Sequence, residues 1–412
     1  EDTLGRSVFA TMGIMAENRR GGTLANATAP DGRPFPEQLD TRRIDTGTVV
    51  RLPVGRKLLS VRGSFAYRSE RRVFGEDLER GRRLTWMGEG VIQGMAGRHT
   101  WLIGGALQQD AYRARDLDGF DYTFTVPGLI AQDEVSLSNK FTVGISARLD
   151  RHSRYGAFAN PRVSLLVKPV PGLSTRLSAG TGYFAPTPFV EETEETGLSR
   201  VRPLARVAAE KARSASFDVA WSRARIEIVA TVFASQVRDP IERRIIGSSA
   251  VELANADGPV RTWGGEFLGR YRTEGFTVIV THNYTRSREQ NPEAPGRRDV
   301  PLTPRNFTGF TAIWEGERWG RFGVEYYYTG RQPLEENPYR DTGRGYALFG
   351  ALLERRFGKL RAFVNLENLG NVRQTHYDPL LRPMRAPDGR WTVDAWAPLD
   401  GRVINGGIRV SF

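Results

Sequence analysis

The chain ends with Gly401-Arg402-Val403-Ile404-Asn405-Gly406-Gly407-Ile408-Arg409-Val410-Ser411-Phe412, and this stretch decides the fold class. One parity carries the apolar residues Ile404, Ile408, Val410 and Phe412, and the other parity is mostly polar. Because successive side chains of a strand point to opposite faces, the pattern predicts a β-strand with one apolar and one polar face. The strand ends on an aromatic residue, whereas the termini of soluble domains usually fray into water.

This closing segment resembles the last strand of bacterial outer-membrane barrels, which carries a signal that the assembly machinery reads. Gly407, Val410 and Phe412 have the spacing of that signal, in which two residues and then one residue separate a glycine and two apolar positions. Gly406 stands before the glycine, where a polar residue is usual. The resemblance implies that the outer-membrane assembly machinery is a partner.

Composition excludes several kinds of membrane segment and site. Hydrophobic residues make up 39% of the 412 residues, and no apolar run reaches the roughly 18 residues of a membrane-spanning helix. A spanning β-barrel fits this composition, because only alternate residues of its strands meet lipid. Cysteine is absent and His occurs only 4 times, so we expect no disulfide, thiol nucleophile, metal centre or cofactor. Gly-x-Ser-x-Gly, Walker-type and metalloprotease patterns are also absent, and we expect no enzyme.

The formal net charge is +12, which raises the question of a nucleic-acid partner. The basic residues are spread along the whole chain and no nucleic-acid-binding module is recognisable, so we expect no such partner. Arginines that face an aqueous lumen or lie near anionic lipid head groups and lipopolysaccharide account for the charge more simply.

Alternating segments recur along the whole chain. In Phe141–Asp150 every odd position is apolar and every even position is polar or Gly. Leu360–Glu367 shows the same pattern except at Phe363, and Arg321–Tyr328 and Gly275–Tyr284 behave similarly. Each segment is about long enough to cross a bilayer as a tilted strand.

The connections between these segments alternate in length. The tight ones are Gly55–Lys57, Gly97–Arg98, Asn139–Lys140, Pro171–Gly172, Arg223–Arg225, Thr273–Gly275, Glu317–Gly320 and Phe357–Lys359. The long, charged, Pro- and Gly-rich ones are Glu17–Arg43, Arg71–Arg83, Arg115–Pro127, His152–Ala159, Pro186–Pro203, Arg288–Pro304, Arg331–Gly345 and Gly370–Asp400. The alternation predicts an all-β, antiparallel transmembrane β-barrel with about 18 strands, short periplasmic turns and long external loops.

Two stretches are harder to assign. Ala256-Asp257-Gly258-Pro259 is compatible with a hairpin or with a bulge, and we interpret Ile245–Arg270 as one strand because this preserves the alternation of the loops. Leu204–Ala215 is the best helical candidate, but it is short and runs into a strand that ends at Trp221.

Further motifs resemble one family, the TonB-dependent outer-membrane receptors, over essentially the whole chain. They are Asn160–Leu165 with Lys168-Pro169, Gly180–Thr187, Trp263–Phe267, Leu302–Arg305, Asn365–Asn371 and the closing strand. The resemblance implies a barrel of about 22 strands with a plugged lumen, which imports a scarce ligand such as a siderophore complex, cobalamin or a glycan. It also implies that the TonB complex drives the import by binding the plug.

Residues 1–412 are therefore expected to be one partial barrel domain, with the plug and about four strands lying outside this sequence. The chain opens on Glu1-Asp2-Thr3-Leu4 without the basic and apolar regions of a signal peptide. We expect that such a peptide was removed or that the sequence is part of a longer protein.

Candidate ligand contacts lie in the last two predicted external loops. Aromatic rings and guanidinium groups at a lumen mouth suit anionic metal chelates or flat ligands. The candidates are Arg331, Tyr339, His376, Tyr377, Arg385, Trp391 and Trp396. An alternative role for Trp391 and Trp396 is to pack the loop or to sit at the membrane interface.

Other charged and aromatic residues favour structural roles. Glu191, Glu192, Glu194 and Glu195 suit a solvated loop better than a cation site. Tyr326 and Tyr328 are expected to point outward in an aromatic girdle. The residues expected to form lumenal pairs are Arg148, Arg176, Glu325, Arg361 and Glu367.

The leading functional hypothesis is a bacterial outer-membrane receptor barrel for TonB-dependent uptake of a small-molecule ligand. The first alternative is a plug-free diffusion channel or assembly-type barrel. The second is a soluble all-β adhesin or sugar-binding module, which requires the apolar parity to face a packed core.

Overall fold

The computed structural model describes residues 5–23, 28–190, 193, 197–247, 250–292, 294–316, 319–386 and 388–410. The strands of its first half are β1 (Ser7–Gly22), β2 (Pro36–Val54), β3 (Lys57–Phe74), β4 (Asp77–Ala96), β5 (His99–Ala114), β6 (Tyr122–Ser136), β7 (Phe141–His152), β8 (Gly156–Val170), β9 (Leu173–Phe184), β10 (Glu210–Arg223) and β11 (Ile226–Arg238). Those of the second half are β12 (Ile241–Ile246), β13 (Ala250–Asn255), β14 (Val260–Arg272), β15 (Phe276–Gln290), β16 (Arg297–Asp299), β17 (Asn306–Gly316), β18 (Gly320–Thr329), β19 (Gln332–Pro333), β20 (Thr342–Gly343), β21 (Tyr346–Phe357), β22 (Leu360–Glu367) and β23 (Val403–Val410). Two short 3₁₀ turns are η1 (Leu198–Arg200) and η2 (Gln374–His376).

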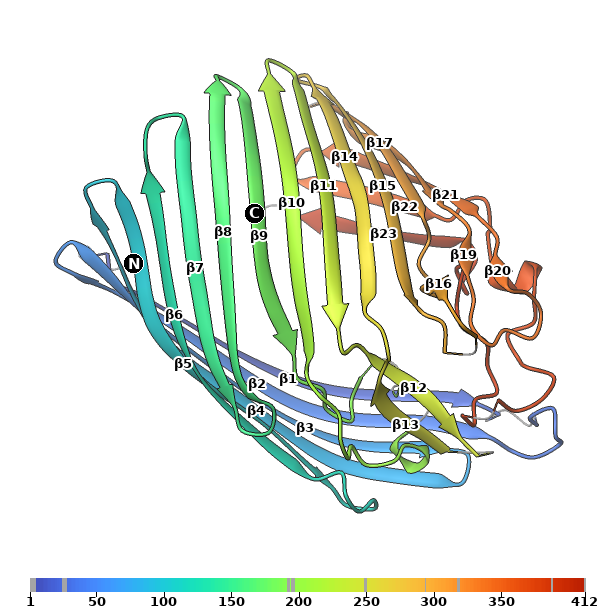
Figure 1. Cartoon of the computed structure of the whole chain (residues 1–412). Helices are drawn as coiled ribbons and strands as arrows, with labels where there is room; N and C mark the ends of the chain where they lie inside the picture. The colour runs from blue at the N-terminus through green and yellow to red at the C-terminus, as the bar shows by residue number, and fades with distance from the viewer. Residues whose placement is uncertain are drawn as a thin grey trace.

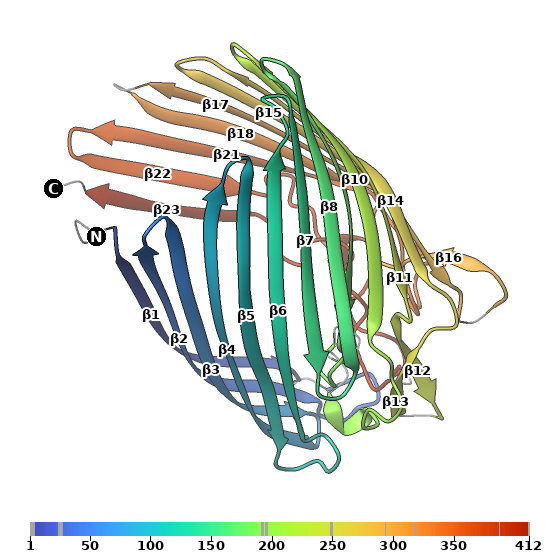
Figure 2. The ribbon, with the colours of Figure 1, turned by 60° about the vertical axis from the view of Figure 1, so that its left-hand side comes forward.

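One large antiparallel sheet curves into a barrel wall (Figure 1). Each wall strand pairs with the next along the chain, with β11 joined directly to β14, β15 to β17 and β18 to β21. Among the described residues the sheet has 19 strands, of which β16 has only 3 residues, so 18 strands form the wall and the expected number is confirmed. In the described part of the chain β1 and β23 do not pair with each other: they are the two edge strands of the sheet and face each other across its open seam (Figure 2).

The two faces of the wall differ as the alternation predicts. On β7 the outward side chains of Ile145 and Leu149 are more than half exposed. The inward neighbours Arg148 and Asp150 bind each other at 2.8 Å. The apolar parity thus faces outward and does not pack against a second sheet, which rules out the soluble module.

The connections are sorted to two ends of the barrel, which we call the turn end and the loop end. Most expected tight turns lie at the turn end, such as Gly55-Arg56 between β2 and β3. No helix among the described residues is long and apolar enough to cross a membrane. The helical candidate Leu204–Ala215 instead leads into β10.

The prediction of a long loop is wrong for two of the eight stretches. Residues Arg71–Arg83 belong to β3 and β4, which pair without interruption up to Phe74 and Asp77 and turn at Gly75-Glu76. His152–Ala159 likewise holds only a short turn between β7 and β8. Beyond the lipid neither face of a strand has to be apolar, so a strand there can be charged on both faces and resembles a loop in sequence.

The interpretation of Ile245–Arg270 as one strand is also wrong. β12 and β13 form a separate hairpin, and β14 begins only at Val260. Short and long connections still alternate along the wall, because β14 pairs directly with β11 and the hairpin projects from the loop end (Figure 1).

Candidate functional site

The loop end holds the side chains that form a candidate ligand site. Inward-facing residues of β3, β4 and β5 line one side of a cavity of about 400 Å³, and the segment between β9 and β10 closes the other side. We call this cavity the lumenal pocket. Its lining residues are Arg68, Glu70, Arg72, Gly81, Arg83, Tyr112, Phe189, Val190, Thr193 and Leu198.

Strand pairing brings the basic groups of the lumenal pocket together. Arg68 lies directly opposite Arg83, and Arg83 lies opposite Tyr112 on the next strand. Arg68 and Arg72 share the carboxylate of Glu70, with Arg72 Nε 3.3 Å from Glu70. Three guanidinium groups and one carboxylate therefore line the pocket, which favours an anionic ligand.

Asp110 holds Arg83 by two hydrogen bonds. Nε and a terminal nitrogen of Arg83 donate to the two carboxylate oxygens at 2.9 and 2.6 Å. This bidentate geometry orients the guanidinium plane. Arg83 also lies 5.6 Å from the ring centre of Phe189, so its cationic face is partly stacked.

The segment between β9 and β10 folds into the lumen because it is anchored on an aromatic cluster. Tyr112 meets Phe189 edge to face at 4.5 Å between ring centres. Leu198 packs with buried aromatic rings of β5 and β6, and the Ser199 amide donates to Glu79 at 2.8 Å. Gly81 is required here because a Cβ at this position would run into the Tyr112 ring.

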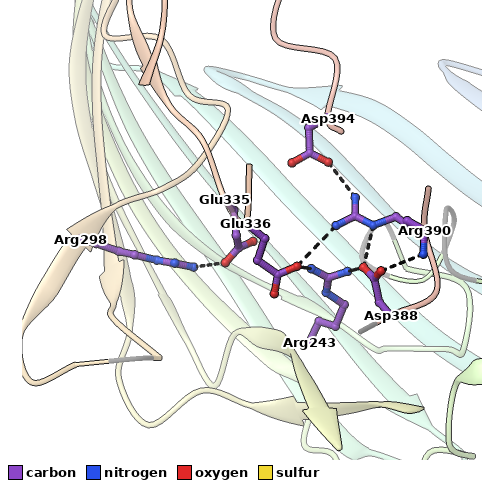
Figure 3. Close-up of polar contacts among 7 residues, drawn as sticks. All are labelled: Arg243, Arg298, Glu335, Glu336, Asp388, Arg390 and Asp394. Atoms are coloured by element: carbon purple, nitrogen blue, oxygen red, sulfur yellow. Dashed lines mark hydrogen bonds and ion pairs between the residues drawn. The ribbon is translucent and has the colours of Figure 1, made fainter. Parts of the chain in front are cut away.

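The last long connection, residues 370–400, is fixed by a network of ion pairs that we call the loop latch: Arg243, Glu336, Asp388, Arg390 and Asp394. Asp388 is fully buried and pairs with both Arg243 and Arg390, the latter at 2.6 Å (Figure 3). Arg243 also reaches Glu336 at 3.3 Å, and Arg390 reaches Asp394 at 2.8 Å. The latch joins the β12–β13 hairpin to the last two long connections.

The charge state of Asp388 depends on these partners. Burial alone raises the pKa of the Asp388 carboxyl group, but the charges of Arg390 and Arg243 and the backbone N–H of Arg390 outweigh it and hold the pKa below the ordinary value. Asp388 is therefore ionised near neutral pH, and the latch is made of charged partners.

Trp391 and Trp396 lie inside the last connection and are almost completely buried. The Trp396 carbonyl accepts from Gln332 at 2.6 Å, and its amide donates to the buried side chain of Gln374 at 2.8 Å. Arg340 lies 5.3 Å from the centre of the Trp396 ring. Both tryptophans pack inside the loop in this structure, and a ligand role for them stays a prediction.

The other candidates lie nearer the surface of the two connections. Tyr339 donates to the Leu381 carbonyl, and His376 contacts Arg373 at 3.0 Å. Tyr377 is 39% exposed and Arg344 lies 5.1 Å from its ring centre, so an aromatic face is already beside a cation. Arg331 is exposed. A ligand role for these four residues stays a prediction.

Arg385 lies beside the connection between β1 and β2. It stacks on Phe35 at 5.0 Å, and its pKa is lowered by burial and by the charge of Arg200, while Asp31 and Asp77 oppose this shift. Arg200 pairs with Asp77 at 3.7 Å, and Arg385 donates to the Gly389 carbonyl at 2.8 Å, so both arginines already have partners. A ligand role for Arg385 stays a prediction.

The sequence interpretation missed the lumenal pocket. Arg72 and Arg83 lie within the stretch Arg71–Arg83 that was expected to be a loop, and Arg68 lies just before it; the density of arginine there was the available signal. The acidic run of Glu191, Glu192, Glu194 and Glu195 lies outside the described residues, as does Phe412 of the assembly signal. Gly407 and Val410 lie on β23, where a Cβ on Gly407 would meet the Phe363 ring at 2.9 Å.

The remaining expected positions are as follows. Tyr326 lies opposite Phe349 and Tyr328 is 37% exposed. Arg361 lies 3.6 Å from Glu354, and Glu367 accepts from Asn365 at 2.6 Å. Within the described ranges no three His, Asp or Glu residues are grouped to hold a metal ion.

Comparisons with known proteins agree with this architecture. The family model described as "TonB dependent receptor-like, beta-barrel" matches residues 17–369. No curated protein sequence matches the chain. The chain is similar in structure to the ferric-catecholate import receptor Fiu from Escherichia coli K12, with a TM-score of 0.72, 11% identity, and coverage of 98% of this chain and 72% of Fiu.

Two further solved structures show the same fold. The FrpB iron transporter from Neisseria meningitidis gives a TM-score of 0.74 at 14% identity, over 98% of this chain and 70% of FrpB. The copper transporter OprC gives 0.67 at 13% identity, over 99% of this chain and 80% of OprC. Identities this low establish the fold alone. The match of the family model over most of the chain shows that this protein belongs to the TonB-dependent receptors, as an outer-membrane transport barrel and not an enzyme.

Proposed function

We propose that this barrel serves TonB-dependent uptake of an anionic metal chelate, with a ferric siderophore as the leading ligand class. The observation that carries the proposal is the lumenal pocket, in which Arg68, Arg72 and Arg83 lie beside Tyr112 and Phe189. Guanidinium groups bind the oxygens of catecholate and carboxylate ligands, and the aromatic rings offer faces to flat chelating groups.

The structural neighbours support a metal-related ligand without identifying it. Fiu imports a ferric catecholate, FrpB transports iron and OprC transports copper. Cobalamin and neutral glycans fit the pocket less well, because a ligand without net negative charge compensates the desolvation of three guanidinium groups less fully.

TonB acts through a plug domain in the mechanism that the family suggests. The loop latch and the segment between β9 and β10 would then cover a ligand held between them and the plug. A plug-free diffusion channel is the competing function, and it predicts transport that does not depend on TonB.

The test uses the full receptor in cells that lack other iron receptors, with a ferric catecholate as the probe. Arg68→Gln with Arg72→Gln should lower binding affinity roughly tenfold or more, since each charge-assisted hydrogen bond contributes about 1.5–3 kcal/mol. Arg62→Gln is the matched control, because Arg62 lies on the same strand and the same face but pairs with Glu89 outside the pocket.

Uptake of the probe should also stop when TonB is deleted. Uptake that continues without TonB would support the diffusion channel. Equal binding by the double variant and the Arg62 control would contradict a role for the lumenal pocket.

A further inference from the structure

A groove crosses the outer face of the wall over β8, β9, β10, β11 and β14. Its floor is a row of small residues, Ala179, Ala215 and Ala234, which lie opposite one another on neighbouring strands. Val163 continues the row on one side and Trp263 on the other. Because methyl groups lie between larger side chains, a cavity of about 800 Å³ is left on this face.

The groove opens toward the lipid. The row next to it on the turn-end side contains Leu165, Leu177, Phe217 and Val232, and all four are exposed on the outside of the wall. An alkyl chain that lies in the groove would therefore contact apolar side chains on its floor and along one side. Burying such a chain against methyl groups and an indole ring is favourable.

The loop-end rim of the groove is basic. Arg213, Gln236 and Arg261 form the next row and line the groove. Lys211 and Arg238 lie opposite each other one row further out. In the described part of the chain none of these four cations has a carboxylate partner.

Positive charge continues along the same face. Arg286, Arg288 and Arg305 share a single carboxylate, that of Asp299. The pKa of Arg297 on β16 is lowered by burial and by the charges of Arg261 and Arg288. An anion at this rim would relieve the repulsion among these groups.

The basic rim of the groove also lies at the height along the barrel where lipid head groups of the outer leaflet are expected. Arg213 precedes the last residue of β10, Arg223, by ten positions, which places it roughly 25 Å above the turn end on a tilted strand. That distance is about the height of the apolar band of an outer-membrane barrel. Trp263 and Tyr284, whose ring centres are 5.6 Å apart, lie at the same level, and Trp and Tyr are enriched at the membrane–water interface.

We propose that this groove binds lipopolysaccharide, with a phosphate group of its lipid A held between Arg213 and Arg261 and an acyl chain lying over Ala215 against Trp263. Arg213 and Arg261 are on strands separated by one other strand, so their Cα atoms are about 10 Å apart and both side chains reach one phosphate. The loop end faces the outer leaflet in barrels of this kind. The proposal does not depend on which ligand is imported.

The test is native mass spectrometry of the full chain, extracted in mild detergent from outer membranes, with the bound lipid identified by mass. The wild-type protein should carry lipid A-containing glycolipid. Arg213→Gln with Arg261→Gln should lower the bound fraction roughly tenfold, and Ala215→Phe should lower it by filling the groove. Arg82→Gln is the matched control, since Arg82 is outward-facing and exposed at the loop end but lies on β4, away from the groove.

Heat-modifiable electrophoretic mobility checks that each variant is folded. The proposal is overturned by equal glycolipid occupancy in the wild-type protein and the double variant, or by phospholipid alone in the wild-type protein. It is equally overturned if Ala215→Phe changes the oligomeric state and leaves glycolipid occupancy unchanged, because the groove would then hold a second copy of the chain.

Discussion

At the residue scale, buried ion pairs fix the connections at the loop end. Asp388 is completely buried, and its two arginine partners come from segments far apart in the chain. Removing one member of such a buried group leaves the others uncompensated, which costs about 3–5 kcal/mol. The latch therefore acts as a single unit.

Asp388→Asn should lower the free energy of local unfolding of residues 370–400 by about 3 kcal/mol, because Arg243 and Arg390 lose the carboxylate charge that both of them pair with. Hydrogen exchange of the backbone amides in this connection measures the effect. Asp400→Asn in the same connection is the control, since Asp400 is exposed. Equal hydrogen exchange in the two variants would show that the loop latch does not stabilise residues 370–400.

The same measurement against pH tests the charge of Asp388. Its pKa is lower in the folded protein than the ordinary 3.8, so the stabilisation is complete above that value and is lost as pH falls through the lower, folded value. Protection in the wild-type connection should thus be constant from neutral pH to about pH 5 and fall only under more acidic conditions. Loss of protection between about pH 7 and 5 would contradict this assignment.

Gly81 and Tyr112 give a second test at this scale. Gly81→Ala should push the Tyr112 ring away from Phe189 and weaken ligand binding in the lumenal pocket, while the barrel still folds. Gly88→Ala is the control on the same strand, because nothing lies within 4 Å of a Cβ added there. If both variants bind a ferric catecholate equally well, Tyr112 does not shape the site.

At the element scale, the β12–β13 hairpin is an attachment to the wall and not part of it. β11 and β14 pair directly through twelve positions below the hairpin. Val251 is fully buried and bridges to Val201, and Asn255 donates to the Ala208 carbonyl at 3.1 Å. The hairpin thus braces the segment between β9 and β10 as well as the latch.

Replacing residues 240–256 by a short Gly-Ser turn should leave the wall folded, since in the part of the hairpin that the structure describes no residue pairs with a wall strand. The segments at 185–209 and 370–400 should then become sensitive to added protease. Arg243→Ala in the intact hairpin should expose only the second segment. Failure of the shortened chain to assemble in the membrane would show that the hairpin is needed for the wall itself.

The sequence predicts the wall well because lipid imposes a strict alternation on segments such as Phe141–Asp150. It fails at Arg71–Arg83, where neither face of the strands meets lipid and both faces carry charged residues, so the apolar/polar alternation is lost. The hairpin was missed because Ile241–Asn255 is rich in strand-forming residues, so the turn at Gly247 gives only a weak break. The latch joins residues 145 positions apart, and such contacts leave no local pattern to detect.

At the scale of the whole molecule, one curved sheet separates an apolar outside from a charged inside. Pairing runs from β1 to β23 through consecutive neighbours, and the connections at the loop end pack together over the lumen. The lumenal pocket, the loop latch and the groove on the outer face all follow from this arrangement.

The chain contains no cysteine, so single cysteines can be placed along β7 without a background signal. Single cysteines at positions 143 to 148 are each labelled with a fluorophore in proteoliposomes. The quencher that lowers the fluorescence should alternate from one position to the next. Positions 143, 145 and 147 should be quenched by lipid-borne quenchers, and positions 144, 146 and 148 by water-soluble ones. Quenching by water-soluble agents at every position, or lipid contact at the even positions, would contradict the claim that the apolar parity of this barrel faces the membrane.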